Sequence, residues 1–154
     1  MTTKGIASRR LLKCLRMTIY VLIGLMPSLG PAESFDGSQS LVCSVDDGRQ
    51  FYLGGQTRPF DPQSVGLPRT FMIDFEGNRI LPTKDNVVRR QTKIERSEHI
   101  ENKLILQGAD DGVEGVDDGI GWSMAVEKSS GKFVIGAAGD KVGYIVFGSC
   151  KPKP

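Results

Sequence analysis

The fold is decided by residues 121–150, which read GWSMAVEKSSGKFVIGAAGDKVGYIVFGSC. Trp122, Met124 and Val126 alternate with small or polar residues, which is the period of a strand with one buried face and one solvated face. Turn residues at 128–131 and 139–141 separate this run from two others, rich in β-branched and aromatic residues, at 133–135 and 142–147. The stretch predicts an antiparallel three-stranded meander.

Similar short runs occur earlier in the chain. Alternating patterns predict strands at residues 41–45, 50–53, 70–75 and 103–107, and the start of a return strand at 80–81. Asp46-Asp47-Gly48-Arg49 has the composition of a hairpin turn between the first two strands. Residues 54–69 contain three prolines and three glycines and predict a long irregular loop, in which Phe60 and Val65 are expected to pack back onto the sheet or line its mouth.

Residues 87–96 fit two structures. A solvated strand face would carry Arg89, Arg90, Lys93 and Arg96, whereas Glu95, Glu98 and Glu101 follow at spacings that support a short helix. We favour the strand. The basic run also suggests contact with an anionic surface such as lipopolysaccharide, although an ordinary solvated face is the simpler interpretation.

Together these runs predict an all-β domain of about eight or nine short strands, because no long helical pattern follows the N-terminal segment. Of the 19 glycines, 16 lie after residue 32, which fits many tight turns. A sheet of this size must protect its edges, and closure does so. We expect a small antiparallel up-and-down barrel or a strongly curled meander, with a β-sandwich as the alternative.

Residues 1–32 have the pattern of a cleaved signal peptide. A basic head precedes the apolar run 17–26, and Gly30-Pro31-Ala32 supplies small residues, so we expect cleavage after Ala32. Ser8-Arg9-Arg10 also partly matches a twin-arginine signal, and an uncleaved anchor is a further alternative. The chain is thus expected to comprise a signal peptide and one β-domain, 33–154, that is periplasmic or secreted in a Gram-negative bacterium and contacts the membrane only during export.

Export changes the charge and the cysteine count. Five of the 20 Lys and Arg residues, but none of the 18 Asp and Glu residues, lie within the first 32 positions, so the mature chain is mildly acidic. Nucleic-acid binding is not expected, because such domains are usually strongly basic. Cleavage also removes Cys14 and leaves Cys43 and Cys150, for which we predict a disulfide that faces the interior.

The acidic stretch 110–118 is the candidate metal site. It carries five carboxylates, on Asp110, Asp111, Glu114, Asp117 and Asp118. Calcium takes several oxygen ligands from flexible loops, but the spacing differs from the EF-hand pattern. A solvated turn built on Asp-Gly pairs is the favoured interpretation. No other cofactor is expected.

The sequence lacks the patterns of common catalytic sites. His99 is the only histidine, so zinc sites and histidine-based triads have little to build on. There is no G-x-S-x-G motif and no phosphate-binding glycine loop. We therefore expect a non-enzymatic protein.

Aromatic residues supply the candidate binding positions. Phe71, Phe75 and Trp122 are able to line a ligand cavity inside a barrel, although such residues more often fill the core. An exported chain with one cysteine near each end of a β-meander resembles the small periplasmic barrels that inhibit lysozymes. Their tryptophan-lysine-glycine stretch is not present, since Ser123-Met124-Ala125 follows Trp122, so the resemblance carries over no functional residue. The expected function is binding of a small or lipidic ligand, and the alternative is an envelope protein-interaction module such as a lysozyme-inhibitor-like protein.

Overall fold

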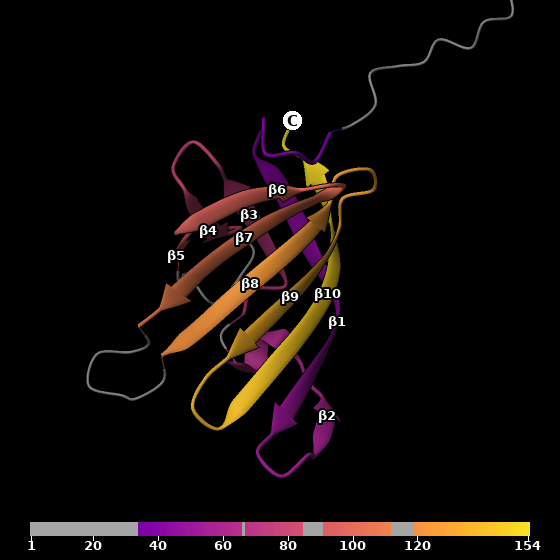
Figure 1. The fold of residues 1–154 in the computed structure, drawn as a ribbon. Coiled ribbons are helices and arrows are strands. Elements are labelled where there is room, and N and C mark those ends of the chain that lie inside the picture. Colours follow the sequence, from indigo (N-terminus) through magenta and orange to yellow (C-terminus); the bar gives the residue numbers. More distant parts are fainter. Residues whose placement is uncertain (1–33, 66, 85–90, 112–118) are drawn as a thin grey trace, which may run out of the picture. The chain divides into compact units, whose positions relative to one another are not determined.

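The computed structural model describes residues 34–65, 67–84, 91–111 and 119–154. They form one antiparallel sheet and a single short 3-10 helix, η1, at Pro62–Val65 (Figure 1). The strands are β1 Leu41–Tyr52, β2 Thr57–Pro59, β3 Thr70–Asp74, β4 Arg79–Pro82, β5 Thr92–Lys93, β6 Arg96–Ile100, β7 Lys103–Asp110, β8 Ile120–Glu127, β9 Lys132–Ala138 and β10 Val142–Pro152. The all-β class and the strongly curled sheet expected from the sequence are confirmed.

The strand order makes the sheet an up-and-down structure. It runs β5-β4-β3-β1-β10-β9-β8-β7-β6, with β2 added beside β1. Apart from β2, neighbouring strands follow one another in the chain, except that β1 pairs with β10 from Leu41↔Pro152 to Tyr52↔Val142. The first long strand and the last strand are therefore direct neighbours in the sheet.

The curl brings the two edges of the sheet together. The hydroxyl of Thr92, on β5, donates to the carbonyl of Ala109 on β7 at 3.2 Å, and the amide of Glu95 donates to the carbonyl of Gln107 at 2.9 Å. A side chain at Gly108 would place its Cβ 2.3 Å from the carbonyl oxygen of Lys93. Glycine at this position therefore permits the close approach of β5 to β7.

The hairpin predicted at residues 46–49 is wrong, because β1 continues through this stretch. A β-bulge between Val45 and Asp47 absorbs one residue, and Gly48 then lies against the ring of Phe60, where a Cβ would approach a ring carbon to 2.6 Å. Glycine is thus required at position 48 by packing and not by a turn. The chain reverses instead at Gly54 and Gly55, whose φ angles are 104° and 84°.

The segment 54–69 is more ordered than the long loop that the sequence predicts, since it holds β2 and η1. The expectation for Phe60 is confirmed, because its ring lies 5.2 Å from that of Tyr144 and packs against the core. Leu67 packs there as well. The side chain of Val65 lies outside the described residues.

The basic region at residues 87–96 becomes strand where it is described. Thr92–Lys93 forms β5 and Arg96–Ile100 forms β6, so residues 96–100 do not adopt the helical alternative. Arg89 and Arg90 lie outside the described residues.

The core lies on the inner side of the curled sheet and is apolar. Its buried side chains belong to Phe35, Leu41, Cys43, Phe71, Ile73, Ile94, Leu104, Leu106, Met124, Val126, Phe133, Ile135, Val146 and Cys150. Met124 and Val126 on β8 and Phe133 and Ile135 on β9 are buried at alternate positions, as the alternation in the sequence predicts. Within the described part of the chain, no buried side-chain nitrogen or oxygen lacks a hydrogen-bond partner.

The predicted disulfide is confirmed. Cys43 and Cys150 are directly opposite each other in the register of β1 and β10, and their sulfur atoms are bonded. Both side chains are buried, as expected from their position on the inner strand faces.

In the segments that the structure describes, no helix is both long enough and apolar enough to cross a membrane.

Candidate interaction surface on the outer sheet face

The three aromatic residues proposed to bind a ligand have separate surroundings. Phe71 is 1% exposed and packs edge-to-face on Phe133, with ring centroids 5.6 Å apart. Phe75 packs against the core from the end of β3. Trp122 is partly buried and donates from Nε1 to the hydroxyl of Thr92 at 3.1 Å. Phe71 therefore lies in the packed core, which is the alternative that the sequence leaves open, and a role of these residues in ligand binding stays a prediction.

The acidic stretch is described only in part. Asp110 ends β7 and Asp111 follows it, whereas Glu114, Asp117 and Asp118 lie outside the described residues. Among the described residues no group of three potential metal ligands is found. The calcium site stays a prediction.

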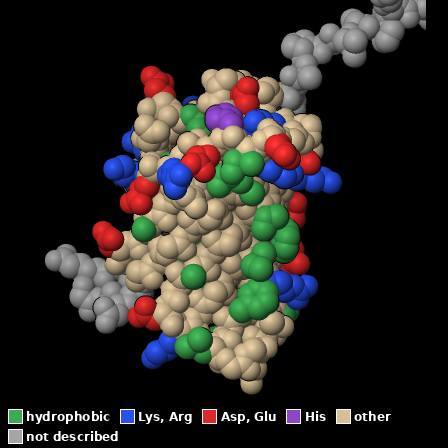
Figure 2. Space-filling model, in the orientation of Figure 1, with side chains coloured by type: hydrophobic (Ala, Val, Ile, Leu, Met, Phe, Trp, Pro, Cys, Tyr) green, Lys and Arg blue, Asp and Glu red, His purple; other side chains and the backbone are tan. Residues whose placement is uncertain are grey.

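Exposed apolar side chains gather on the outer face of the sheet, which we define as the outward side of β1 and β6–β10. Phe51, Val134 and Phe147 are about 40% exposed there, at 38%, 42% and 42%. They come from β1, β9 and β10, which lie side by side in the sheet. Figure 2 shows this side of the molecule: charged side chains gather at one end of the strands, and the middle of the face is largely free of them.

Two rows of cross-strand neighbours organise the outer face. The first, here called the arginine row, consists of Arg49, Ile145, Gly136, Ser123, Gln107 and Arg96. The second, here called the acid row, consists of Asp47, Phe147, Val134, Ala125, Ile105 and Glu98. Each row begins on β1 and ends on β6, and between its charged ends it carries only uncharged residues.

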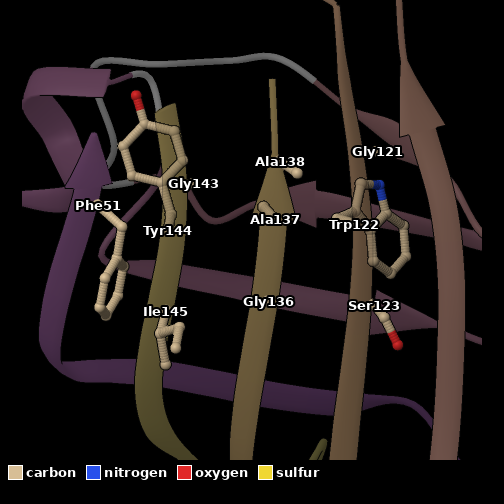
Figure 3. A pocket seen from close by; sticks show the side chains of 10 residues that line it. All are labelled: Phe51, Gly121, Trp122, Ser123, Gly136, Ala137, Ala138, Gly143, Tyr144 and Ile145. Atoms are coloured by element: carbon tan, nitrogen blue, oxygen red, sulfur yellow. The ribbon is translucent and has the colours of Figure 1, made fainter. Parts of the chain in front are cut away.

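A shallow hollow of about 460 Å³ lies beside the arginine row (Figure 3). Phe51 and Ile145 stand at one side of it and Trp122 and Ser123 at the other. Between them the surface consists of backbone and small side chains, from Gly121, Gly136, Ala137, Ala138 and Gly143. The hollow is therefore uncharged and flat-floored.

The glycines of this floor are not explained by packing within the chain. A Cβ built on Gly121 or Gly136 meets no atom within 4 Å, and neither residue has a positive φ. Glycine weakens a strand interior, and one reason for its presence is the close approach of another group. The bare backbone at Gly136 thus marks a place where a second surface can come close.

Tyr144 alternates with the outward residues of β10 and packs on Phe60. Burial, followed by the nearby Tyr52, raises the pKa of its phenol. Since the phenol is neutral at physiological pH, the hollow carries no charge from this residue either.

Ion pairs mark the margins of the outer face. Arg49 and Asp47 pair within β1 at 3.4 Å, and Arg96 pairs with Glu98 within β6. Beyond the acid row, Lys103 pairs with Glu127 at 3.2 Å. Hydrogen bonds from Ser130 and then from Lys103 lower the pKa of Glu127. Exposed ion pairs of this kind add little stability to the fold. The arrangement of their charges on the surface therefore matters more for recognition of a partner than for folding.

Two continuous apolar runs in the sequence indicate that the outer face is apolar as well as the inner one. In β10 the run Tyr144-Ile145-Val146-Phe147 is apolar at every position, and Phe133-Val134-Ile135 in β9 is likewise. A strand with one solvated face would alternate, whereas a continuous apolar run indicates burial on both faces. The structure covers only the inner face, so the outer apolar residues are left for another contact.

Comparison of the chain with protein-family models, with curated proteins and with solved structures finds no match.

Proposed function

We propose that the chain is an exported, non-enzymatic β-domain that binds another protein of the cell envelope through its outer face. The observation that supports this is the exposure of Phe51, Val134 and Phe147 on one sheet face while the interior is packed with the domain's own side chains. Large apolar patches on a soluble domain are typical of interaction sites. The uncharged hollow and the bare glycine floor favour a partner that approaches the sheet closely.

Export is part of the proposal. The Cys43–Cys150 disulfide fits an oxidising compartment, since such bonds form in the periplasm or outside the cell. The signal-like residues 1–32 point to the same compartment. A periplasmic or secreted protein of a Gram-negative bacterium meets envelope proteins and not nucleic acid.

The proposal is tested by photo-crosslinking in the native host. A photoreactive phenylalanine derivative replaces Phe147 on the outer face, and in a matched variant it replaces Leu53, which is 79% exposed in the turn that follows β1. We expect a discrete protein adduct from position 147 and none from position 53. Absence of any adduct from position 147, or equal adducts from both positions, would contradict the proposal.

A small or lipidic ligand is the second candidate, and the hollow of Figure 3 favours it. Its volume of about 460 Å³ and its apolar lining are within the range of small-molecule sites. Native and denatured mass spectra of protein recovered from its host separate the two: extra mass that is lost on denaturation supports a ligand, and the bare chain mass speaks against one.

A further inference from the structure

Three consecutive apolar residues are exposed where β1 ends, and we call Phe51, Tyr52 and Leu53 the apolar tip. Phe51 and Tyr52 are each 38% exposed and Leu53 is 79% exposed. The turn itself needs only Gly54 and Gly55, which supply the positive φ angles. A run of exposed apolar residues is unfavourable in a soluble domain unless it has a function. The apolar tip therefore indicates a contact outside the chain.

The apolar tip is apolar on both sides of the β1–β2 hairpin. Phe51 and Tyr52 are successive residues of β1, so their side chains point to opposite sides of it, and Leu53 follows at the end. A Cβ built on Gly54 or Gly55 meets no atom within 4 Å. Figure 1 shows the hairpin projecting at the end of the strands opposite the C-terminus. A flat protein surface would cover one side of this tip, whereas lipid surrounds an inserted group.

Backbone amides of the turn already have partners within the chain. The amide of Tyr52 donates to the carbonyl of Gln56 at 3.0 Å, and the amide of Gly55 donates to the carbonyl of Tyr52 at 3.1 Å. The amide of Leu53 donates to the carbonyl of Lys141 at 3.3 Å. Unpaired backbone groups are costly in apolar surroundings, where no water replaces the partner. These three amides therefore do not oppose entry of the tip into lipid.

Two cations lie beside the apolar tip. The guanidinium of Arg58 lies 5.8 Å from the ring centre of Tyr52, and Lys141 lies in the turn between β9 and β10. In the described part of the chain neither cation forms an ion pair. Asp140 is the acid next to Lys141, so the three side chains together carry one net positive charge. Aromatic rings beside basic side chains suit the headgroup level of a bilayer, and the positive charge favours anionic lipid.

We infer that the apolar tip inserts into the headgroup region of a bilayer that contains anionic lipid. Phe51, Tyr52 and Leu53 enter the boundary between headgroups and acyl chains, while Arg58 and Lys141 contact the lipid phosphates. The inference goes beyond the proposed function, because the tip shares only Phe51 with the outer face. It also gives the folded domain a membrane contact, which the sequence leads us to expect only during export.

The first test is sedimentation of the full chain, produced by export with its disulfide intact, with lipid vesicles. We expect binding to vesicles of phosphatidylcholine mixed with phosphatidylglycerol, and weaker binding to phosphatidylcholine alone. Leu53→Asp is expected to weaken binding about tenfold or more, whereas Leu53→Trp should retain it. Ile100→Asp, a matched change at a residue that is 53% exposed before the turn between β6 and β7, should leave binding unchanged. No binding to the mixed vesicles, or equal binding of Leu53→Asp and the parent chain, overturns the inference.

Charge variants test the preference for anionic lipid. Arg58→Gln and Lys141→Gln are each expected to weaken binding to the mixed vesicles about fivefold and to leave binding to phosphatidylcholine unchanged. Asp140→Asn removes the neighbouring carboxylate and is expected to strengthen binding to the mixed vesicles. Circular dichroism confirms the fold of each variant. Equal affinity of the parent chain and both glutamine variants for the mixed vesicles would overturn the role of the two cations.

Crosslinking separates this inference from the proposed function. With the mixed vesicles, a photoreactive phenylalanine derivative at position 53 is expected to add the mass of a lipid to the chain, and the same derivative at position 100 is expected to add none. A lipid adduct at position 53 leaves the comparison of protein adducts between positions 147 and 53 unaffected. If position 53 gives no lipid adduct but a discrete protein adduct in the host, the tip binds a protein and the inference is wrong.

Discussion

Cys43 and Cys150 are directly opposite each other in the register of the first long strand and the last strand, so their disulfide links these two neighbouring strands in the middle of the sheet. The two residues are separated by 107 positions in the sequence. Since every other long strand of the sheet lies between them along the chain, this one bond ties together the ends of the whole domain.

Removal of the disulfide is expected to destabilise the domain strongly. A bond that closes a loop of this length restricts the unfolded chain, and the chain-entropy treatment gives about 4 to 5 kcal/mol for roughly 100 residues. Urea unfolding of the oxidised chain, of the reduced chain and of the Cys43→Ser/Cys150→Ser variant measures the difference. An unchanged midpoint on reduction would show that the bond adds nothing to stability.

Phe71 is expected to act as a core residue. Phe71→Ala removes a ring that is 1% exposed and should cost about 3 to 5 kcal/mol of unfolding free energy through lost burial and a new cavity. Phe147→Ala, at an outer-face ring that is 42% exposed, is the matched control and should change stability by less than about 1 kcal/mol at low protein concentration. Equal losses in the two variants would contradict this assignment.

Gly48 and Gly136 are expected to respond in opposite ways to alanine. Gly48→Ala drives a methyl group into the ring of Phe60 and should destabilise the domain by about 1 to 3 kcal/mol, as overpacking does. Gly136→Ala enters open space and should be neutral or slightly stabilising at low protein concentration, because alanine has less backbone entropy to lose. Thermal unfolding of both variants checks this. A neutral Gly48→Ala variant would mean that Phe60 moves aside freely.

Acid sensitivity is expected from Asp36. Hydrogen bonds from the Ser38 hydroxyl, then from the Ser38 amide, lower the pKa of this carboxyl to about 2 from 3.8. The folded state therefore binds fewer protons than the unfolded state between these values, so the stabilising contribution is complete above about pH 4 and is lost as the pH falls toward 2. Asp36→Asn should flatten this part of the pH–stability curve. Identical curves for the two proteins would rule out the contribution.

The contact between β5 and β7 is expected to depend on the hydroxyl of Thr92. Thr92→Val removes the group that accepts from the Trp122 indole and donates to the Ala109 carbonyl, so the contact between β5 and β7 should loosen. Amide exchange at Glu95, whose N–H donates to Gln107, should accelerate, and the emission of the single tryptophan should shift to the red. Thr92→Ser keeps the hydroxyl and should retain the slow exchange. Equal exchange rates in both variants would contradict the role of the hydroxyl.

The sequence predicts those features of the fold that depend on local alternation. The meander at residues 121–150 and the strand at Thr70–Asp74 are both found, because each follows from side-chain period within a few residues. The disulfide is found as well, since two cysteines remain in the predicted mature chain.

The errors come from contacts between distant residues. From the local sequence, Gly48 resembles a turn glycine. Its actual role is to make room for the ring of Phe60, which lies 12 positions later in the chain, and no local pattern predicts that contact. The exposure of Phe147 and Val134 depends likewise on which side of the sheet the domain leaves uncovered. The unbroken apolar runs in β9 and β10 are the features that indicate the second apolar face from the sequence alone.

The pairing of β1 with β10 also sets the order of events when the chain matures. The final strand, β10, pairs with β1 along its whole length, so the nascent chain cannot complete its sheet before β10 has been synthesised. Sequence-distant pairing of this kind is slow to form. Completion of the sheet and formation of the Cys43–Cys150 disulfide are therefore expected to be late steps of folding.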